Sequence, residues 1–380
     1  MTTSKTITTS KTITTSKTMT NTMTKISTTW MTVAFAALAL AACAVEQAPV
    51  EGTVHQALEE CPDWACGQNG PLLNGRYFHE LSESRAPNRE GFSISGNLMK
   101  NGIAYYPSVS GTQLRASSRL HGTLTGAQLV GAYFDISHDT GKRYRVVING
   151  HSTMQIFSGP MKGTVIPQYV LQWIEVTPGV PVDHYQNLCS NPPTGTYRQE
   201  TLFQHGESTL FFEGSRYKAD TKDVMFGDSN WFNLSCAGSA LSKMLLTGFT
   251  NVTGAANQQQ QQTALKVITA DYCGDGKSFT VAGEPLYWKT QNGYMTFVGQ
   301  PISFEARWNA EGPVCLDNAR LVDSDLQTAK DNFPVAADGT PGVEAAMLAH
   351  CPEKVPPACN AMPANYDFAG AFAVSANPPL

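Results

Sequence analysis

The chain has 380 residues, with 26 basic and 31 acidic side chains and a formal net charge of −5 at pH 7. This acidic balance, with no run of basic residues beyond the first 42 positions, excludes a nucleic-acid-binding protein, because phosphate contacts require clustered Lys and Arg. The length is sufficient for two domains of ordinary size.

Residues 1–42 have the pattern of a bacterial lipoprotein signal peptide. A low-complexity Thr/Ser/Lys segment without acidic residues precedes an uncharged apolar stretch from Trp30 to Ala42. That stretch is shorter than the roughly 20 residues that cross a bilayer. The run Leu40-Ala41-Ala42-Cys43 resembles a lipobox, whose cysteine carries the lipid and becomes the first residue after cleavage. We therefore expect a lipid on Cys43 and a tether over residues 43–60.

The lipobox predicts a place in the bacterial cell envelope, with the membrane as a partner through Cys43. Ala44 is not the aspartate that is associated with inner-membrane retention in some bacteria, which favours the outer membrane. Envelope proteins or glycans are the other expected partners. No cofactor is expected.

The remaining eight cysteines are candidates for disulfides, because an even number in an oxidising compartment favours pairing. A metal site is not expected, since the chain has no Cys-x2-Cys pair and no two histidines at ligand spacing near a cysteine pair. Short Pro- and turn-rich spacings favour the pairs Cys61–Cys66 and Cys351–Cys359, and the other four stay unassigned. The candidates are Cys61, Cys66, Cys189, Cys236, Cys273, Cys315, Cys351 and Cys359.

Residues 61–191 have the pattern of an antiparallel β domain. The dipeptide Asn101-Gly102 between two apolar runs is typical of a hairpin with a type I′ turn. A second hairpin is expected around residues 139–141. Tyr144, Val146 and Ile148 alternate with other residues along the strand that follows, so one face of this strand is expected to be buried.

A Pro-rich linker at 191–195 separates this region from a second one that contains helices. Strands are expected at 210–212, 231–234 and 302–308, and a third hairpin around Asn292-Gly293. Helices are expected at 239–246 and 257–272, the latter with Asn257 as its N-cap, and two shorter ones at 323–332 and 343–350. The predicted fold class is α+β, dominated by antiparallel β structure. Residues 361–380 are expected to be a C-terminal tail.

One motif carries a family resemblance. The residues Ala270, Asp271, Tyr272, Cys273, Gly274, Asp275 and Gly276 resemble the signature of the ADYC-domain family, found largely among predicted lipoproteins of myxobacteria and their relatives. Segments 232–236 and 304–308, and the cysteine-bounded segment 351–359, are also similar. The resemblance implies a disulfide-stapled domain over residues 192–360, in which helices pack on antiparallel strands. It implies no reaction, because the function of the family is not established.

The motif residues also have a physical interpretation. Asp271 lies near a helix C-terminus, where an acid opposes the helix dipole, and we expect it to organise the turn by accepting bonds from the turn amides that follow. Tyr272 is expected to face the core, and Cys273 to staple the helix end to a strand. Gly274 and Gly276 allow positive φ angles where the chain leaves the helix.

Known catalytic patterns are incomplete in this segment. Asp271 stands where a phosphate-binding loop ending at Lys277-Ser278 requires glycine, and Ala282 stands where a calcium loop requires an acid. A looser calcium site at Asp271 and Asp275 stays open. The favoured function is a non-catalytic structural or binding module. The alternative is an extracytoplasmic hydrolase, with a site assembled around Asp271, Asp275, Glu284 and a histidine.

Overall fold

The structure is a computed structural model of the 380-residue chain. The chain divides into two units, Met1–Val50 and Glu51–Leu380, and every described residue belongs to the second. The predicted leader, Cys43 and the tether lie outside the described residues, as does the expected pair Cys61–Cys66. The described residues are 70–176, 185–189, 208–225, 227, 230–254, 256–281, 284–297, 301, 303–359 and 367–377.

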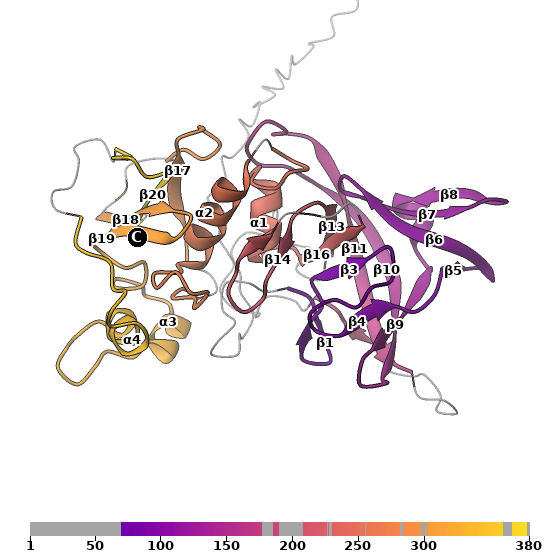
Figure 1. Ribbon diagram of the computed structural model, residues 1–380, viewed down its shortest axis with the longest axis horizontal. Coiled ribbons are helices and arrows are strands. Elements are labelled where there is room, and N and C mark those ends of the chain that lie inside the picture. The colour runs from indigo at the N-terminus through magenta and orange to yellow at the C-terminus, as the bar shows by residue number, and fades with distance from the viewer. Residues whose placement is uncertain are drawn as a thin grey trace, which may run out of the picture. The chain divides into compact units, whose positions relative to one another are not determined.

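Within these ranges, twelve strands form one large antiparallel sheet (Figure 1). Ten run in the order β3-β16-β13-β11-β10-β9-β5-β6-β7-β8, while β12 pairs with β11 and β4 pairs with β9. The strands are β3 (Glu80–Ser82), β4 (Phe92–Ile94), β5 (Leu98–Lys100), β6 (Ile103–Ser110), β7 (Gln113–Ser118), β8 (Gly122–Thr125), β9 (Tyr133–His138), β10 (Arg143–Gln155), β11 (Val165–Glu175), β12 (Gln186–Asn187), β13 (Ser208–Glu213) and β16 (Trp231–Cys236).

The first two predicted hairpins are confirmed. Asn101 and Gly102 connect β5 to β6 with φ angles of +50° and +77°, as a type I′ turn requires. The turn around Gly141 connects β9 to β10. Tyr144, Val146 and Ile148 are buried as expected.

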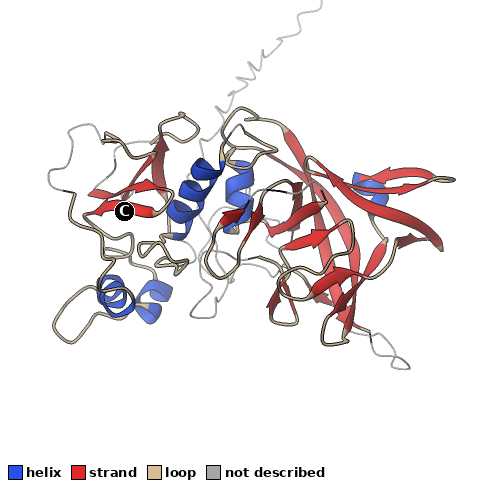
Figure 2. Ribbon diagram, viewed as in Figure 1, coloured by secondary structure: helices blue, strands red, loops and turns tan. Residues whose placement is uncertain are grey.

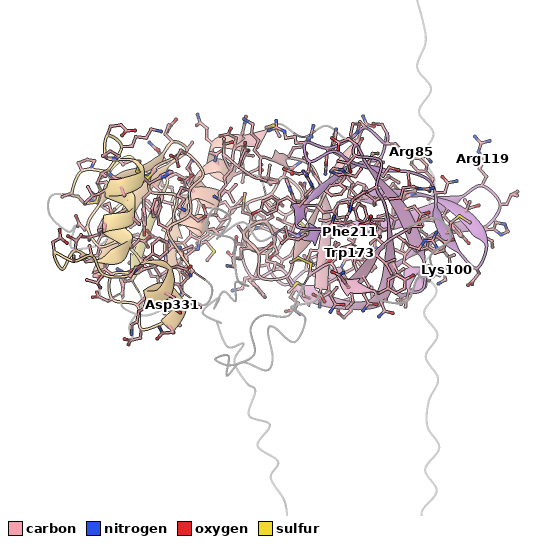
Figure 3. The ribbon with its side chains drawn as sticks, turned by 90° about the horizontal axis from the view of Figure 1, so that it is seen from below. Arg85, Lys100, Arg119, Trp173, Phe211 and Asp331 are labelled. Atoms are coloured by element: carbon pink, nitrogen blue, oxygen red, sulfur yellow. A yellow bond between two sulfur atoms is a disulfide. The ribbon has the colours of Figure 1, made fainter. Side chains whose placement is uncertain are left out.

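The buried face of the large sheet carries its own hydrophobic core. Aromatic rings pack edge to face across the strands, for example Tyr169 against Phe211 with a centroid distance of 5.6 Å. Trp173 and Phe211, both labelled in Figure 3, are 7% and 1% exposed. Such aromatic pairs contribute beyond the area that they bury.

A second antiparallel sheet has four strands in the order β17-β20-β18-β19. The predicted third hairpin is wrong, because residues 295–297 do not form a strand and β17 pairs with the C-terminal β20 instead. A turn remains at Asn292-Gly293, closed by the bond from Thr290 N to Met295 O at 3.1 Å. The strands are β17 (Tyr287–Thr290), β18 (Ser303–Asn309), β19 (Gly312–Leu316) and β20 (Ala373–Asn377).

The expected C-terminal tail therefore contains a strand of the second sheet. β20 pairs with both β17 and β18, and Ala373, Val374 and Ser375 are buried. The indole of Trp308 on β18 donates to Ser375 Oγ at 2.7 Å. The sequence pattern missed β20 because its alternation of small and apolar residues is weak.

Two helices lie between the sheets (Figure 2). α1 (Ala240–Leu246) contacts β16 of the large sheet, and α2 (Gln258–Thr269) contacts β18 and β20 of the second sheet. The other described helices are η1 (Gly126–Leu129), α3 (Gln327–Asn332) and α4 (Gly342–His350). Two small hairpins pair β1 (Leu72–Leu73) with β2 (Arg76–Tyr77) and β14 (Arg216–Tyr217) with β15 (Val224–Met225). No described helix is long and apolar enough to span a membrane.

The predicted boundary between residues 191 and 192 falls inside the large sheet. β11 pairs with β13, and β3 pairs with β16, so strands from both predicted domains belong to one sheet. The Cys189–Cys236 disulfide also joins the two parts. The fold is α+β and β-dominated, with antiparallel sheets and disulfides, as the sequence predicts.

Candidate functional site

The motif residues form a tight turn at the C-terminal end of α2. The helix ends at Thr269, earlier than the predicted Tyr272, because Ala270 takes a left-handed conformation with φ +48°. Asp271 N then donates back to Lys266 O at 3.0 Å, which closes the last turn of the helix. The motif residues from Asp271 onward therefore lie outside the helix.

Both motif glycines are required by the backbone. Gly274 and Gly276 have φ angles of +69° and +98°, as expected from the sequence. A Cβ on Gly274 would lie 2.3 Å from Glu311 O, and one on Gly276 would lie 2.2 Å from Asp220 O. The turn is thus pressed against two other loops, and neither position tolerates a side chain.

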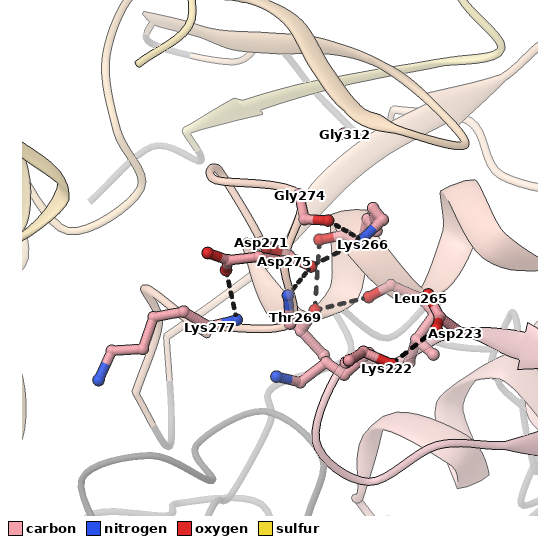
Figure 4. Close-up of polar contacts among 12 residues, drawn as sticks. Lys222, Asp223, Leu265, Lys266, Thr269, Asp271, Gly274, Asp275, Lys277 and Gly312 are labelled. Carbon is pink, nitrogen blue, oxygen red and sulfur yellow. Dashed lines mark hydrogen bonds and ion pairs between the residues drawn. The ribbon is translucent and has the colours of Figure 1, made fainter. Parts of the chain in front are cut away.

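Asp271 is fully buried and organises the turn (Figure 4). Its Oδ2 accepts from Gly276 N at 2.8 Å, which confirms the expected bond to a turn amide. The same oxygen accepts from Lys266 Nζ at 2.8 Å, and this ammonium also donates to Gly274 O at 3.0 Å. The Lys266 side chain is 3% exposed, so the ion pair lies inside the protein. The cation beside Asp271 is therefore a lysine of the chain itself.

Tyr272 points into the core, as predicted, and its hydroxyl is fully engaged. It donates to Glu305 Oε1 at 2.7 Å and accepts from Arg320 N at 2.8 Å. The ring stacks on Trp308 at a centroid distance of 5.5 Å. Burial, and then the negative charge of Glu305, raise the pKa of Tyr272 well above its usual range. This hydroxyl therefore stays protonated and serves as a structural donor.

Glu305 and Arg320 form a second buried ion pair that the sequence analysis missed. Arg320 Nη2 lies 3.0 Å from Glu305 Oε1 and donates to Val267 O at 2.8 Å. The guanidinium thus satisfies a carbonyl in the last turn of α2, where a positive charge is favourable. Glu305 lies in one of the family-like segments, but a charged residue on a strand gives no sequence signal of burial.

Glu284 lies in a separate, mostly buried contact. Its Oε2 accepts from Ser324 Oγ at 2.5 Å, and only 7% of the residue is exposed. Burial raises the pKa of Glu284 to about 6, against the lowering effects of the Ser324 bond and the charge of Arg320. This carboxyl changes its ionisation near neutral pH.

The disulfides correct part of the predicted pairing. The bonds are Cys189–Cys236, Cys273–Cys351 and Cys315–Cys359, so the expected Cys351–Cys359 pair is wrong. The segment before Cys359 lies against β19, where Leu316 N donates to Pro357 O at 3.0 Å. This places Cys359 at Cys315 and leaves Cys351 free to reach the motif.

The partner of Cys273 also differs from the expectation. Cys273 staples the end of α2 to Cys351, which directly follows α4, and not to a strand. The bond spans 78 residues in sequence. A pairing of this kind depends on the tertiary arrangement of two helices, which sequence spacing does not reveal.

Asp275 and His350 lie beside this disulfide. Asp275 Oδ2 is 3.0 Å from His350 Nε2, and Asp275 Oδ1 accepts from Lys277 N at 3.2 Å (Figure 4 shows the latter bond). Burial favours a higher pKa for Asp275, but the Lys277 amide and the charge of His350 outweigh it and hold the pKa below its usual value. Both side chains are partly exposed, at 31% for Asp275 and 40% for His350.

The three carboxylates of the hydrolase alternative have separate partners. Asp271 binds Lys266, Asp275 binds His350, and Glu284 binds Ser324. Within the described ranges, the cluster of His, Cys, Asp or Glu ligand atoms within 4.8 Å of one another comprises Cys273, Asp275 and His350. The structure thus brings one predicted carboxylate to a histidine.

Comparison with protein families identifies the domain that the motif resembles. The ADYC domain model matches residues 126–322, more than half of the 380-residue chain. The chain therefore belongs to the ADYC domain family. No curated protein and no solved structure gives a significant match to it.

The matched region differs from the predicted domain of residues 192–360. It begins at residue 126 and so includes β9, β10 and β11, in agreement with the shared sheet. It ends at residue 322, before α3, α4 and β20. The cysteine partner of Cys273 therefore lies beyond the matched region.

Proposed function

We propose that this protein is a lipid-anchored cell-envelope protein that acts as a non-catalytic structural or binding module. The carrying observation is that the motif side chains are bound within the protein. Asp271 is paired with Lys266, the Tyr272 hydroxyl binds Glu305, and Cys273 is bonded to Cys351. Groups used in this way hold the turn at the end of α2, and the one oxygen of the Asp271 carboxylate that has no hydrogen-bond partner, Oδ1, is buried away from any substrate.

The proposed location rests on two independent features. Residues 1–43 have the pattern of a signal peptide followed by a lipobox that ends at Cys43. The three disulfides among the described residues support an oxidising compartment, because such bonds persist outside the reducing cytoplasm. Envelope proteins or glycans are the proposed partners, and the outer membrane the proposed site of anchoring.

The anchor is tested by expressing the full chain and a Cys43→Ser variant in a Gram-negative bacterium. The wild-type chain should enter the membrane fraction and carry a lipid on an N-terminal Cys43, as seen by intact mass. The variant should lack the lipid and the processed terminus. A wild-type chain recovered with residues 1–42 still attached and no lipid would contradict the proposal.

The alternative function, an extracytoplasmic hydrolase, is favoured by one observation. Asp275 and His350 form a partly exposed pair at 3.0 Å, the arrangement in which a carboxylate orients a histidine base. The test is turnover of ester, glycoside and peptide substrates by the purified full chain. His121→Ala, at an exposed histidine, is the control. If the wild type hydrolyses a substrate, His350→Ala abolishes this activity and His121→Ala retains it, the protein is a hydrolase and the proposal of a non-catalytic module is wrong.

A further inference from the structure

Two pairs of metal-ligating residues meet between α2 and α4. The turn after α2 supplies Cys273 and Asp275, two positions apart, and the end of α4 supplies His350 and Cys351, which are adjacent. The disulfide joins one member of each pair, and the Asp275–His350 contact joins the others. Three of these potential ligands, Cys273, Asp275 and His350, form one cluster, and the fourth, Cys351, is bonded to the Cys273 sulfur.

The spacing of these atoms suits a tetrahedral ion. The Cys273, Asp275 and His350 ligand atoms all lie within 4.8 Å of one another, and Asp275 Oδ2 is 3.0 Å from His350 Nε2. Bond lengths of about 2.0–2.3 Å around zinc imply ligand–ligand edges of about 3.3–3.8 Å. To reach this geometry, the two sulfur atoms, now bonded to each other, would have to separate, and the Asp275–His350 contact would have to lengthen from 3.0 Å.

The chemical types of these ligands favour zinc over other metal ions. Thiolate and imidazole ligands are typical of zinc, and a carboxylate is an accepted fourth ligand. The oxidised cluster offers only Asp275 and His350, since disulfide sulfurs are poor ligands. Zinc affinity at this place should therefore depend on whether the cysteines are joined.

We propose that the Cys273–Cys351 disulfide and a zinc ion are alternative staples between the α2 turn and α4, selected by the redox state. A dithiol reductant donates two electrons and two protons, which breaks the S–S bond to two thiols while the reductant becomes a disulfide. Zn²⁺ then binds both thiolates, with release of two protons, together with His350 Nε2 and an Asp275 oxygen.

The surroundings allow an ion to enter without unfolding the core. Cys273 and Cys351 are 5% and 1% exposed, but His350 and Asp275 lie at the surface of the cluster. Leu348, on the same last turn of α4, is 52% exposed. The exposed side chains of Leu348 and His350 therefore mark the side from which zinc and reductant would reach the sulfurs.

The test uses the purified full chain, oxidised or fully reduced with a non-chelating phosphine, and titrated with Zn²⁺ or with Co²⁺ as an optical probe. The reduced protein should bind one equivalent of Zn²⁺ and give the sulfur-to-cobalt charge-transfer band of a tetrahedral thiolate site. His350→Ala and Asp275→Asn should each weaken Zn²⁺ binding by at least about tenfold. The oxidised protein should give no charge-transfer band.

Matched variants separate this site from the other cysteines. The double variant Cys189→Ser/Cys236→Ser should retain the band, and Cys273→Ser/Cys351→Ser should lose it. His121→Ala, at an exposed histidine on the β7–β8 turn, should bind like the wild type. The proposal is overturned by no stoichiometric binding, by binding that His350→Ala leaves unchanged, or by binding seen only after the near-UV circular dichroism of the fold is lost.

Discussion

At the scale of single residues, the motif turn and the residues packed around it place charges where solvent does not reach. Asp271 and Glu305 are fully buried, and each faces a buried cation, Lys266 or Arg320. Burying an ion is costly unless it is paired and hydrogen-bonded, and removing one partner leaves the other charge uncompensated. The two pairs therefore fix the end of α2 in one arrangement.

Removal of the Asp271 carboxylate should be strongly destabilising. In Asp271→Ala, the Lys266 ammonium loses its counterion and Gly276 N its acceptor, so the free energy of unfolding should fall by about 3–5 kcal/mol. Urea unfolding followed by near-UV circular dichroism measures the loss. The double variant Lys266→Met/Asp271→Ala should be more stable than the single variant, because no charge is left unpaired. An unchanged melting temperature for Asp271→Ala would refute the role assigned to this residue.

Glu284 should make stability depend on pH. Its pKa of about 6 in the folded protein exceeds the ordinary value of 4.5, so the folded state binds the proton more tightly than the unfolded state. Its contribution is fully present below about pH 4.5 and is lost as the pH rises through about 6. At pH 7.5 the ionised carboxylate should cost about 2 kcal/mol.

The variant Glu284→Gln removes this titration and keeps a group that can accept from Ser324. Relative to wild type, it should gain stability progressively between about pH 4.5 and 7, measured by urea unfolding across that range. A stability difference between the two proteins that does not change with pH would show that Glu284 is not the group responsible.

At the scale of elements, α2 illustrates which helix ends can be predicted. Its start follows from local chemistry, since Asn257 accepts from Gln260 N at 2.9 Å and the Gln260 side chain accepts from Asn257 N at 3.1 Å. Its end does not, because Ala270 is a poor candidate for a left-handed conformation on sequence grounds. The two motif glycines downstream suggested a longer helix than the structure contains.

The capping box gives a prediction for this element. Asn257→Ala removes the acceptor for one unpaired amide at the start of α2 and should lower the free energy of unfolding by about 1 kcal/mol. Gln259→Ala, an exposed change in the same first turn, should stay within about 0.5 kcal/mol of wild type. Thermal unfolding of both variants provides the comparison, and equal effects would argue against a specific cap.

At the scale of the whole molecule, distant segments complete each layer. β20 is the inner strand that joins β17 to β18, although more than sixty residues separate it from either partner. β3 and β16 are likewise paired, although they are the first and the last strands of the large sheet in chain order. The chain beyond the matched family region therefore supplies parts that the matched region needs.

Truncation should reveal this dependence. A chain ending at Cys359 lacks β20, which exposes buried neighbours such as Trp288 and Trp308 and leaves Trp308 Nε1 without Ser375. We expect loss of the near-UV circular dichroism signal and of a single cooperative transition. A chain ending at Asn377 keeps all of β20 and is the control. Native-like spectra for the shorter chain would mean that β20 is dispensable.

Features that depend on near neighbours along the chain could be predicted from the sequence. The Asn101-Gly102 hairpin, the Asn257 cap, the alternation along β10 and the positive φ angles of Gly274 and Gly276 all follow from local backbone and side-chain chemistry. The α+β class could likewise be predicted, because it follows from the periodicity of apolar residues. The family motif could be recognised because its residues are contiguous.

The contacts between groups far apart in the sequence could be seen only in the folded chain. It placed Cys351 at Cys273, Glu305 and Arg320 at Tyr272, and His350 at Asp275. It also joined the two predicted domains in one sheet and put β20 inside the other. The physical reason is that these contacts depend on how whole helices and strands pack against one another. A local pattern of residues along the chain does not specify that packing.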